Sequence, residues 1–162
     1  MTAQFESLLA HVLTACREYY GERLVSLAVF GSVGRGTPRH DSDIDLLIVA
    51  EALPNGRLKR VDEFRVIEAK LAPRLAEART DGLATELSPV FKTPAEVQQG
   101  SLLFLDMTED ARILYDRENF LREALAQFKE RLNRLGARRV WQGNAWFWDL
   151  KPDYKPGEVF EI

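Results

Sequence analysis

The chain has 162 residues, enough for one domain with a single hydrophobic core and too few for two full domains. Hydrophobic residues make up 46% and charged residues 29% of the sequence, which is ordinary for a globular protein. The formal net charge of −3 gives no overall positive field, so we expect no nucleic-acid partner for the whole chain, although a local phosphate site is compatible with it.

Periodic apolar residues predict the first elements along the chain. Residues 3–21 repeat apolar side chains at helical spacing, and Gly21 should end this helix. Residues 24–30 and 43–50 are short apolar runs with β-branched members, which indicates two buried strands. A second helix follows the turn at residues 54–56, and its apolar positions are Leu58, Val61, Phe64, Ile67, Leu71 and Leu75.

Helices and strands continue to alternate in the second half of the chain. Residues 83–91 predict a third strand, and residues 111–116 predict a fourth. Between them, Thr93 can cap a short helix that has proline at its first position and Glu96 three residues on. A last helix begins near Phe120, keeps its apolar spacing to Leu135 and ends at Gly136.

This alternation predicts an α/β (α+β) fold with a small mixed sheet flanked by helices. We assign residues 1–136 to that domain, including its C-terminal helix. Residues 137–162 are expected to form an irregular aromatic tail that is not a separate domain. The tail holds all three tryptophans, and their packing on the domain or at a protein interface is a better expectation than stacking on nucleic-acid bases.

The cellular location is expected to be cytoplasmic. The single cysteine, Cys16, excludes an internal disulfide and fits a reducing compartment. The first residues, MTAQFESLLAHVL, lack the basic lead of a signal peptide and have the spacing of an amphipathic helix. No apolar run has the roughly 20 residues that a membrane-spanning helix needs, so no membrane partner is expected.

The segment GSVGRGTPRHDSDID between the first two strands carries the chemical signal. Gly31 lets the backbone turn sharply after the strand, and the amides and the Ser32 hydroxyl that follow could bind phosphate. Arg35 and Arg39 could contact phosphate oxygens. Taken alone, these residues fit a plain glycine-rich loop between two strands better than a binding site.

The pair Asp43 and Asp45 changes that balance. Residues two apart on a strand point to the same face, so both carboxylates should project together. At about 5 Å and an effective dielectric near 20, they repel by roughly 3 kcal/mol, and Mg²⁺ bound to both would remove this repulsion. A solvated acidic turn would explain Asp41 but not Asp45, which lies inside the predicted strand.

Gly31-Ser32, a ten-residue spacer and Asp43-Ile44-Asp45 together resemble the signature of the DNA polymerase β-like nucleotidyltransferase superfamily. Within this superfamily, the segment is most similar to the small stand-alone members, the minimal nucleotidyltransferases. This resemblance implies that Gly31, Ser32 and Arg35 bind a nucleoside triphosphate and that Asp43 and Asp45 bind two Mg²⁺ ions. It also implies a third carboxylate on a later strand, for which Glu86 is the candidate, since Asp81 and Asp106 are less well placed.

The leading functional hypothesis is Mg²⁺-dependent transfer of a nucleoside monophosphate, AMP from ATP, to an acceptor hydroxyl. The resemblance implies an antitoxin-like role in which the acceptor lies on a partner, a helical HEPN-type protein. One alternative is a catalytically weak binding partner of such a protein, and a less favoured one is an antibiotic-modifying enzyme. Because the tail is short for enclosing a small acceptor, we expect a macromolecular acceptor, with a partner or a homo-oligomer and a docking face around Trp146 and Trp148.

Overall fold

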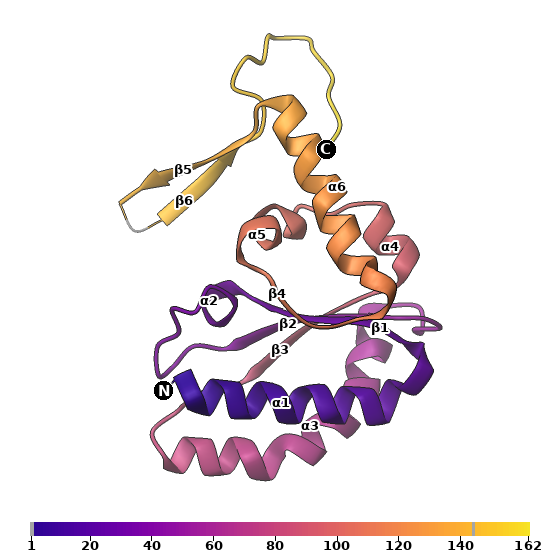
Figure 1. Ribbon diagram of the computed structural model, residues 1–162, viewed down its shortest axis with the longest axis vertical. Helices are drawn as coiled ribbons and strands as arrows, with labels where there is room; N and C mark the ends of the chain where they lie inside the picture. Colours follow the sequence, from indigo (N-terminus) through magenta and orange to yellow (C-terminus); the bar gives the residue numbers. More distant parts are fainter. Residues whose placement is uncertain (1, 144) are drawn as a thin grey trace.

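The computed structural model describes residues 2–143 and 145–162, and its centre is a four-stranded mixed sheet between two layers of helices (Figure 1). The strand order is β3-β2-β1-β4. The central strand β1 runs antiparallel to β2 and to β4, whereas β2 and β3 are parallel. This confirms the predicted fold class; the strands are β1 (Leu24–Phe30), β2 (Ile44–Ala50), β3 (Leu87–Lys92) and β4 (Arg112–Asp116).

Helices α1 (Thr2–Tyr20) and α3 (Arg57–Thr80) cover one face of the sheet. Their apolar sides and the facing strand residues form a continuous core in which Phe5, Cys16 and Phe64 are at most 1% exposed. Each large apolar side chain buried in this way stabilises the fold by about 1.5–3 kcal/mol. Burial raises the pKa of the Cys16 thiol to about 12, so this cysteine is a neutral core residue, as its place on the apolar stripe suggests.

The opposite face is covered by α4 (Pro94–Gln98), α5 (Leu103–Asp110) and α6 (Phe120–Leu135). A second core lies there, around the edge-to-face pair Phe104 and Phe128 and the strand residues Leu47 and Val49. Strands β1 and β2 are therefore buried on both faces, which explains why their sequences are almost continuously apolar. Among the helices of the described ranges, none combines the length and apolarity needed to cross a bilayer.

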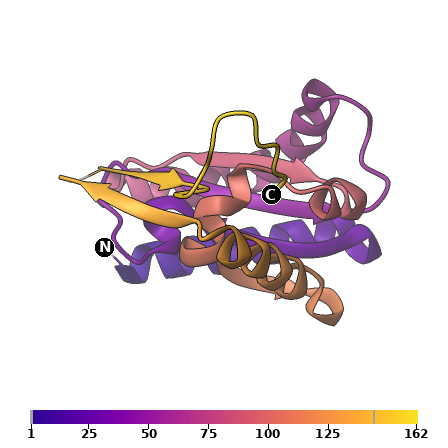
Figure 2. The same cartoon turned by 90° about the horizontal axis from the view of Figure 1, so that it is seen from above.

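The prediction of an irregular tail was wrong for its first half. Strands β5 (Arg138–Gln142) and β6 (Ala145–Asp149) form an antiparallel hairpin, and Figure 2 shows it reaching toward the end of the molecule where the chain begins. The available sequence signal was a Gly-Asn dipeptide at 143–144 between two runs with aromatic residues, a common hairpin connection. From Leu150 onward the tail has no helix or strand.

The predicted cap of α4 is confirmed in detail. The Thr93 hydroxyl accepts a hydrogen bond from the Glu96 amide at 3.2 Å, and the Glu96 carboxylate accepts one from the Thr93 amide at 2.7 Å. Both terminal nitrogens of Arg60 also donate to Glu96, at 2.8 and 3.1 Å. The Arg60 hydrogen bonds are the main reason, and the Thr93 amide a smaller one, why the pKa of Glu96 falls to about 2 although burial opposes the shift.

We predict that Glu96→Gln lowers the free energy of unfolding at pH 7 by about 1 kcal/mol, because it removes the negative charge that pairs with Arg60 and strengthens the hydrogen bond from the Thr93 amide. The folded-state pKa of Glu96 lies below its ordinary value, so its contribution is complete above about pH 4.5 and is lost as the pH falls toward 2. Urea denaturation of both proteins between pH 7 and 2.5 should show the difference shrinking over this window. Glu77→Gln, which breaks an exposed ion pair with Arg74, is the control and should change little.

Candidate active site

The glycine-serine turn lies directly beside the acid pair. Strand β1 ends at Phe30, which pairs with Asp45 across the antiparallel ladder, and α2 (Gly31–Gly34) adds a single helical turn. The Gly31 backbone has φ +64°, and a Cβ atom there would collide with the Asp45 Oδ2 oxygen. A Cβ atom at Gly34 would similarly meet the backbone oxygens of Asp110 and Val29. Both glycines are therefore required by close approach, and the first also by its backbone conformation.

Asp45 lies on the sheet face that carries α5 and α6, while Ile44, Leu46 and Ile48 are buried on the other face, and alternation of side chains assigns Asp43 to the same face as Asp45. Strand β2 begins at Ile44, so Asp43 lies one residue before it and is exposed, whereas Asp45 is half-buried. Burial is the largest cause of the raised pKa of Asp45, and the negative charge of Asp43 adds to it. The Ser88 hydroxyl and the charge of Arg35 lower that pKa and so stabilise the carboxylate.

These oxygen atoms suit a hard divalent cation. Two carboxylates on one face and a serine hydroxyl are ligands of the type that Mg²⁺ accepts alongside substrate phosphates. The half-buried Asp45 charge is unfavourable by itself, which is the electrostatic condition that a bound cation relieves. Across residues 2–143 and 145–162, no three acidic, histidine or cysteine side chains come close enough together to hold a metal ion by themselves. A cation at Asp43 and Asp45 would therefore need further ligands, such as the phosphates of a nucleotide.

Glu86 lies just outside the strand in which it was expected. Strand β3 begins at Leu87, and the backbone oxygen of Glu86 accepts a hydrogen bond from the Ile44 amide at 2.8 Å. The parallel register places Ser88 opposite Asp45, so alternation places Glu86 on the same face as both, with an exposed side chain. Ser88, which was not predicted from the sequence, therefore occupies the position next to Asp45.

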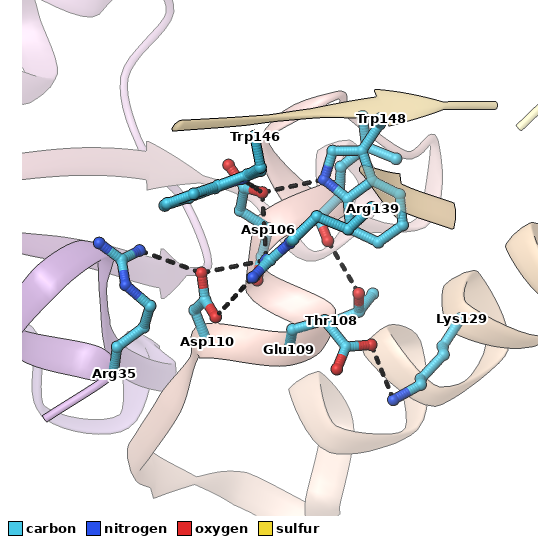
Figure 3. A network of polar contacts seen from close by, with 10 residues as sticks. Arg35, Asp106, Thr108, Glu109, Asp110, Lys129, Arg139, Trp146 and Trp148 are labelled. Carbon is cyan, nitrogen blue, oxygen red and sulfur yellow. Dashed lines mark hydrogen bonds and ion pairs between the residues drawn. The ribbon is translucent and has the colours of Figure 1, made fainter. Parts of the chain in front are cut away.

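Arg35 leaves the glycine-rich turn toward α5 instead of toward solvent. Its Nη1 donates to Asp110 Oδ2 at 3.1 Å, and its guanidinium lies 4.8 Å from the centre of the Trp146 ring (Figure 3). Arg39, also considered as a phosphate contact, instead forms an exposed ion pair with Asp41 at 3.3 Å. Of the two loop arginines, only Arg35 is thus held by the rest of the protein.

The hairpin completes a network that the sequence did not reveal. Arg139 donates two hydrogen bonds to the Asp110 carboxylate at 3.1 and 3.2 Å and one to the Asp106 carboxylate at 3.2 Å. The indole nitrogens of Trp146 and Trp148 also donate to Asp106, each at 2.9 Å (Figure 3). Both tryptophans therefore pack on their own domain, as one of the two expectations for the tail had it, and both remain half-buried.

We predict that Gly31→Ala destabilises the fold more than Gly36→Ala, a control in the same loop. Both glycines have positive φ, but a Cβ atom at Gly36 would meet nothing within 4 Å. The backbone penalty of about 1–2 kcal/mol is common to both variants, and only Gly31→Ala must also displace Asp45, for about 1 kcal/mol more. Chemical denaturation measures the difference, and equal losses would mean that Asp45 moves aside at no cost.

Comparisons with known proteins show which family the chain belongs to. Residues 9–97 match the family model of the nucleotidyltransferase domain, a range that includes the turn, the acid pair and Glu86. A Methanocaldococcus jannaschii protein named as a protein adenylyltransferase is 30% identical over 131 residues, covering 80% of this chain and 84% of that protein. The protein adenylyltransferase MntA of Thermococcus cleftensis is 36% identical over 72 residues, covering 44% of this chain and 70% of that protein.

Among solved structures, a chain from the complex of the tri-AMPylated Shewanella oneidensis HEPN toxin with MNT antitoxin aligns with a TM-score of 0.45. The identity is 12%, and the alignment covers 84% of this chain and 93% of that one. The family model spans more than half of this chain, and the M. jannaschii relative aligns with most of its length. The chain therefore belongs to the nucleotidyltransferase domain family and is a nucleotidyltransferase.

Proposed function

We propose that this nucleotidyltransferase moves AMP from ATP to a hydroxyl group on a partner protein. The observation that carries the proposal is the pair Asp43 and Asp45 on one sheet face, with Asp45 directly against the Gly31 backbone. The names of two relatives, at 30% and 36% identity, support protein as the acceptor and adenylyl as the group transferred.

In this proposal each residue of the site has a distinct task. The amides after Gly31 and the Ser32 hydroxyl hold the triphosphate, and Asp43 and Asp45 hold two Mg²⁺ ions. The ions, when bound, neutralise the triphosphate and the departing pyrophosphate. The acceptor oxygen attacks the α-phosphorus in line and pyrophosphate leaves from the opposite side, so the protein mainly positions the reactants and stabilises charge.

The openness of the site supports a macromolecular acceptor. Asp43 is exposed, and of five hollows on the described surface, of about 130 to 510 Å³, one is lined in part by Glu86 and none by Asp43 or Asp45. A protein loop carrying a hydroxyl side chain can reach such an open site, whereas a small acceptor such as an antibiotic needs walls around it. We propose a HEPN-type protein as the first acceptor to test, and the cytoplasm as the place where the two proteins meet. A homo-oligomer of this chain is the other assembly to examine.

One observation favours the second candidate, a catalytically weak binding partner of a HEPN-type protein. Ser88, and not an acid, stands opposite Asp45, and no third acidic side chain joins the pair within the described ranges. In our proposal Glu86, on the same face, supplies the third carboxylate by turning its exposed side chain toward a bound cation. The two candidates differ in whether the wild-type protein transfers AMP to its partner at an appreciable rate.

We predict that Asp43→Asn and Asp45→Asn each reduce AMP transfer by about 10³-fold or more, because each removes a charge that binds the cation. The folded state should be as stable or slightly more stable, since the repulsion between the two carboxylates disappears. Intact-mass analysis of a HEPN-type partner after incubation with ATP and Mg²⁺ should show added AMP units, which EDTA or either substitution abolishes. Asp41→Asn, an exposed change in the same loop, should keep the activity; wild-type rates in both site variants would refute the proposal.

For Glu86, we predict that Glu86→Gln lowers kcat by about 10²-fold with little change in ATP affinity, because the carboxylate acts during transfer. Asp81→Asn, which changes an exposed acid in the turn before β3, is the control. Steady-state kinetics of AMP transfer separates kcat from KM. An unchanged kcat in Glu86→Gln would leave Asp43 and Asp45 as the whole carboxylate set.

A further inference from the structure

The β5-β6 hairpin presents one chemically distinct face to the nucleotidyltransferase domain. Its ladder pairs Arg139 with Trp148 and Trp141 with Trp146, so these four side chains share one face of the hairpin. Three of them contact the acidic residues of α5, as described above, and Trp141 is the one left 59% exposed. The hairpin is therefore attached through charged and hydrogen-bonded groups, together with the packing of Trp148 on the second core.

The attachment leads directly to the glycine-serine turn. The side chain of Asp110 is only 6% exposed and is shared by Arg35, from the turn, and Arg139, from the hairpin. Two arginines and two aspartates alternate from Arg35 to Asp106, so the charges of the cluster balance one another around the buried Asp110. A buried carboxylate that lost one of its two arginines would draw the remaining one closer.

Arg35 keeps free hydrogen-bond donors in this arrangement. One of its five N–H groups is used by Asp110, one face of its guanidinium lies against Trp146, and the side chain is 27% exposed. Figure 3 shows Arg35 at one side of the network, separated from Arg139 by Asp110. Because Arg139 shares the Asp110 charge, Arg35 is only partly neutralised and remains attractive to an anion.

We propose that Asp110, Arg139 and Trp146 are positioning residues for triphosphate binding. They hold the Arg35 guanidinium beside the glycine-serine turn, with its free N–H groups available to the phosphates of ATP. An arginine already held in place loses little conformational freedom when the ligand binds, which strengthens binding without a new contact. The hairpin is then part of the nucleotide site, and this inference rests on the proposed function.

The test is Mg²⁺-ATP affinity, measured by titration calorimetry without acceptor, together with KM and kcat for AMP transfer. Trp146→Leu removes the stacked ring, and Arg139→Lys removes the paired hydrogen bonds to Asp110. Both should raise Kd and KM by about tenfold with a much smaller change in kcat, since Arg35 would bind ground state and transition state alike. Trp146→Phe keeps a ring over Arg35 and should retain most of the affinity, and Phe147→Leu, on the other hairpin face and 52% exposed, should bind as the wild type does.

A double-mutant cycle separates positioning from general structural support. If Trp146 acts through Arg35, then Arg35→Ala combined with Trp146→Leu should bind Mg²⁺-ATP no more weakly than Arg35→Ala alone. Additive losses, or wild-type affinity in both Trp146→Leu and Arg139→Lys, would overturn the inference while the proposed function stands. Absence of Mg²⁺-ATP binding by the wild-type protein would overturn both. Thermal unfolding shows whether each variant is folded. If Trp146→Leu does not fold, the affinities of Trp146→Phe and Arg139→Lys for Mg²⁺-ATP are compared instead.

Discussion

The Asp45 carboxylate lies against the backbone of Gly31, with no room for a side chain between them, and the site depends on this contact. The contact exists because β1 and β2 pair with Phe30 opposite Asp45. Both strands are buried on both faces, so a slip of one residue would turn Asp45 into the core beneath α1 and α3. The two apolar cores therefore hold the register, and the register places the carboxylates beside the turn.

The negative charges of Asp43 and Asp45 destabilise the fold locally, and the neighbouring residues offset this effect only in part. Burial and the Asp43 charge raise the pKa of Asp45, while Ser88 and Arg35 act in the opposite direction. Such a balance leaves a half-buried carboxylate that gains from a cation, which is the usual state of a metal-binding pair before its ligand arrives. A serine beside Asp45 stabilises its charge without adding a third negative one, so the resting site carries less repulsion than three carboxylates would.

A second set of charges connects the turn to the end of the chain. Asp110 is buried because it ends α5 under the hairpin, and a buried carboxylate is tolerated only when it is paired. Arg35 and Arg139 pair with Asp110 from opposite sides. The close packing of Gly34 on the Asp110 backbone brings the turn near enough for Arg35 to reach the Asp110 carboxylate. The hairpin, α5 and the turn are thereby joined in one polar cluster next to the acid pair.

The sequence by itself determined most of the elements before the hairpin and the candidate residues at the centre of the site. Apolar periodicity is a local property, so it predicted α1, both buried strands and the α4 cap, and the Gly31-Ser32 and Asp43-Asp45 pairs followed from spacing along one loop. Only the tertiary structure decided the position of Ser88, the exposure of Glu86 and the self-packing of Trp146 and Trp148. The Arg35–Asp110 contact spans 75 positions, and the Trp146–Asp106 contact spans 40. Pairing partners so far apart leave no periodic trace in the sequence, because which charge meets which is settled only when the sheet register and the helix packing bring them together.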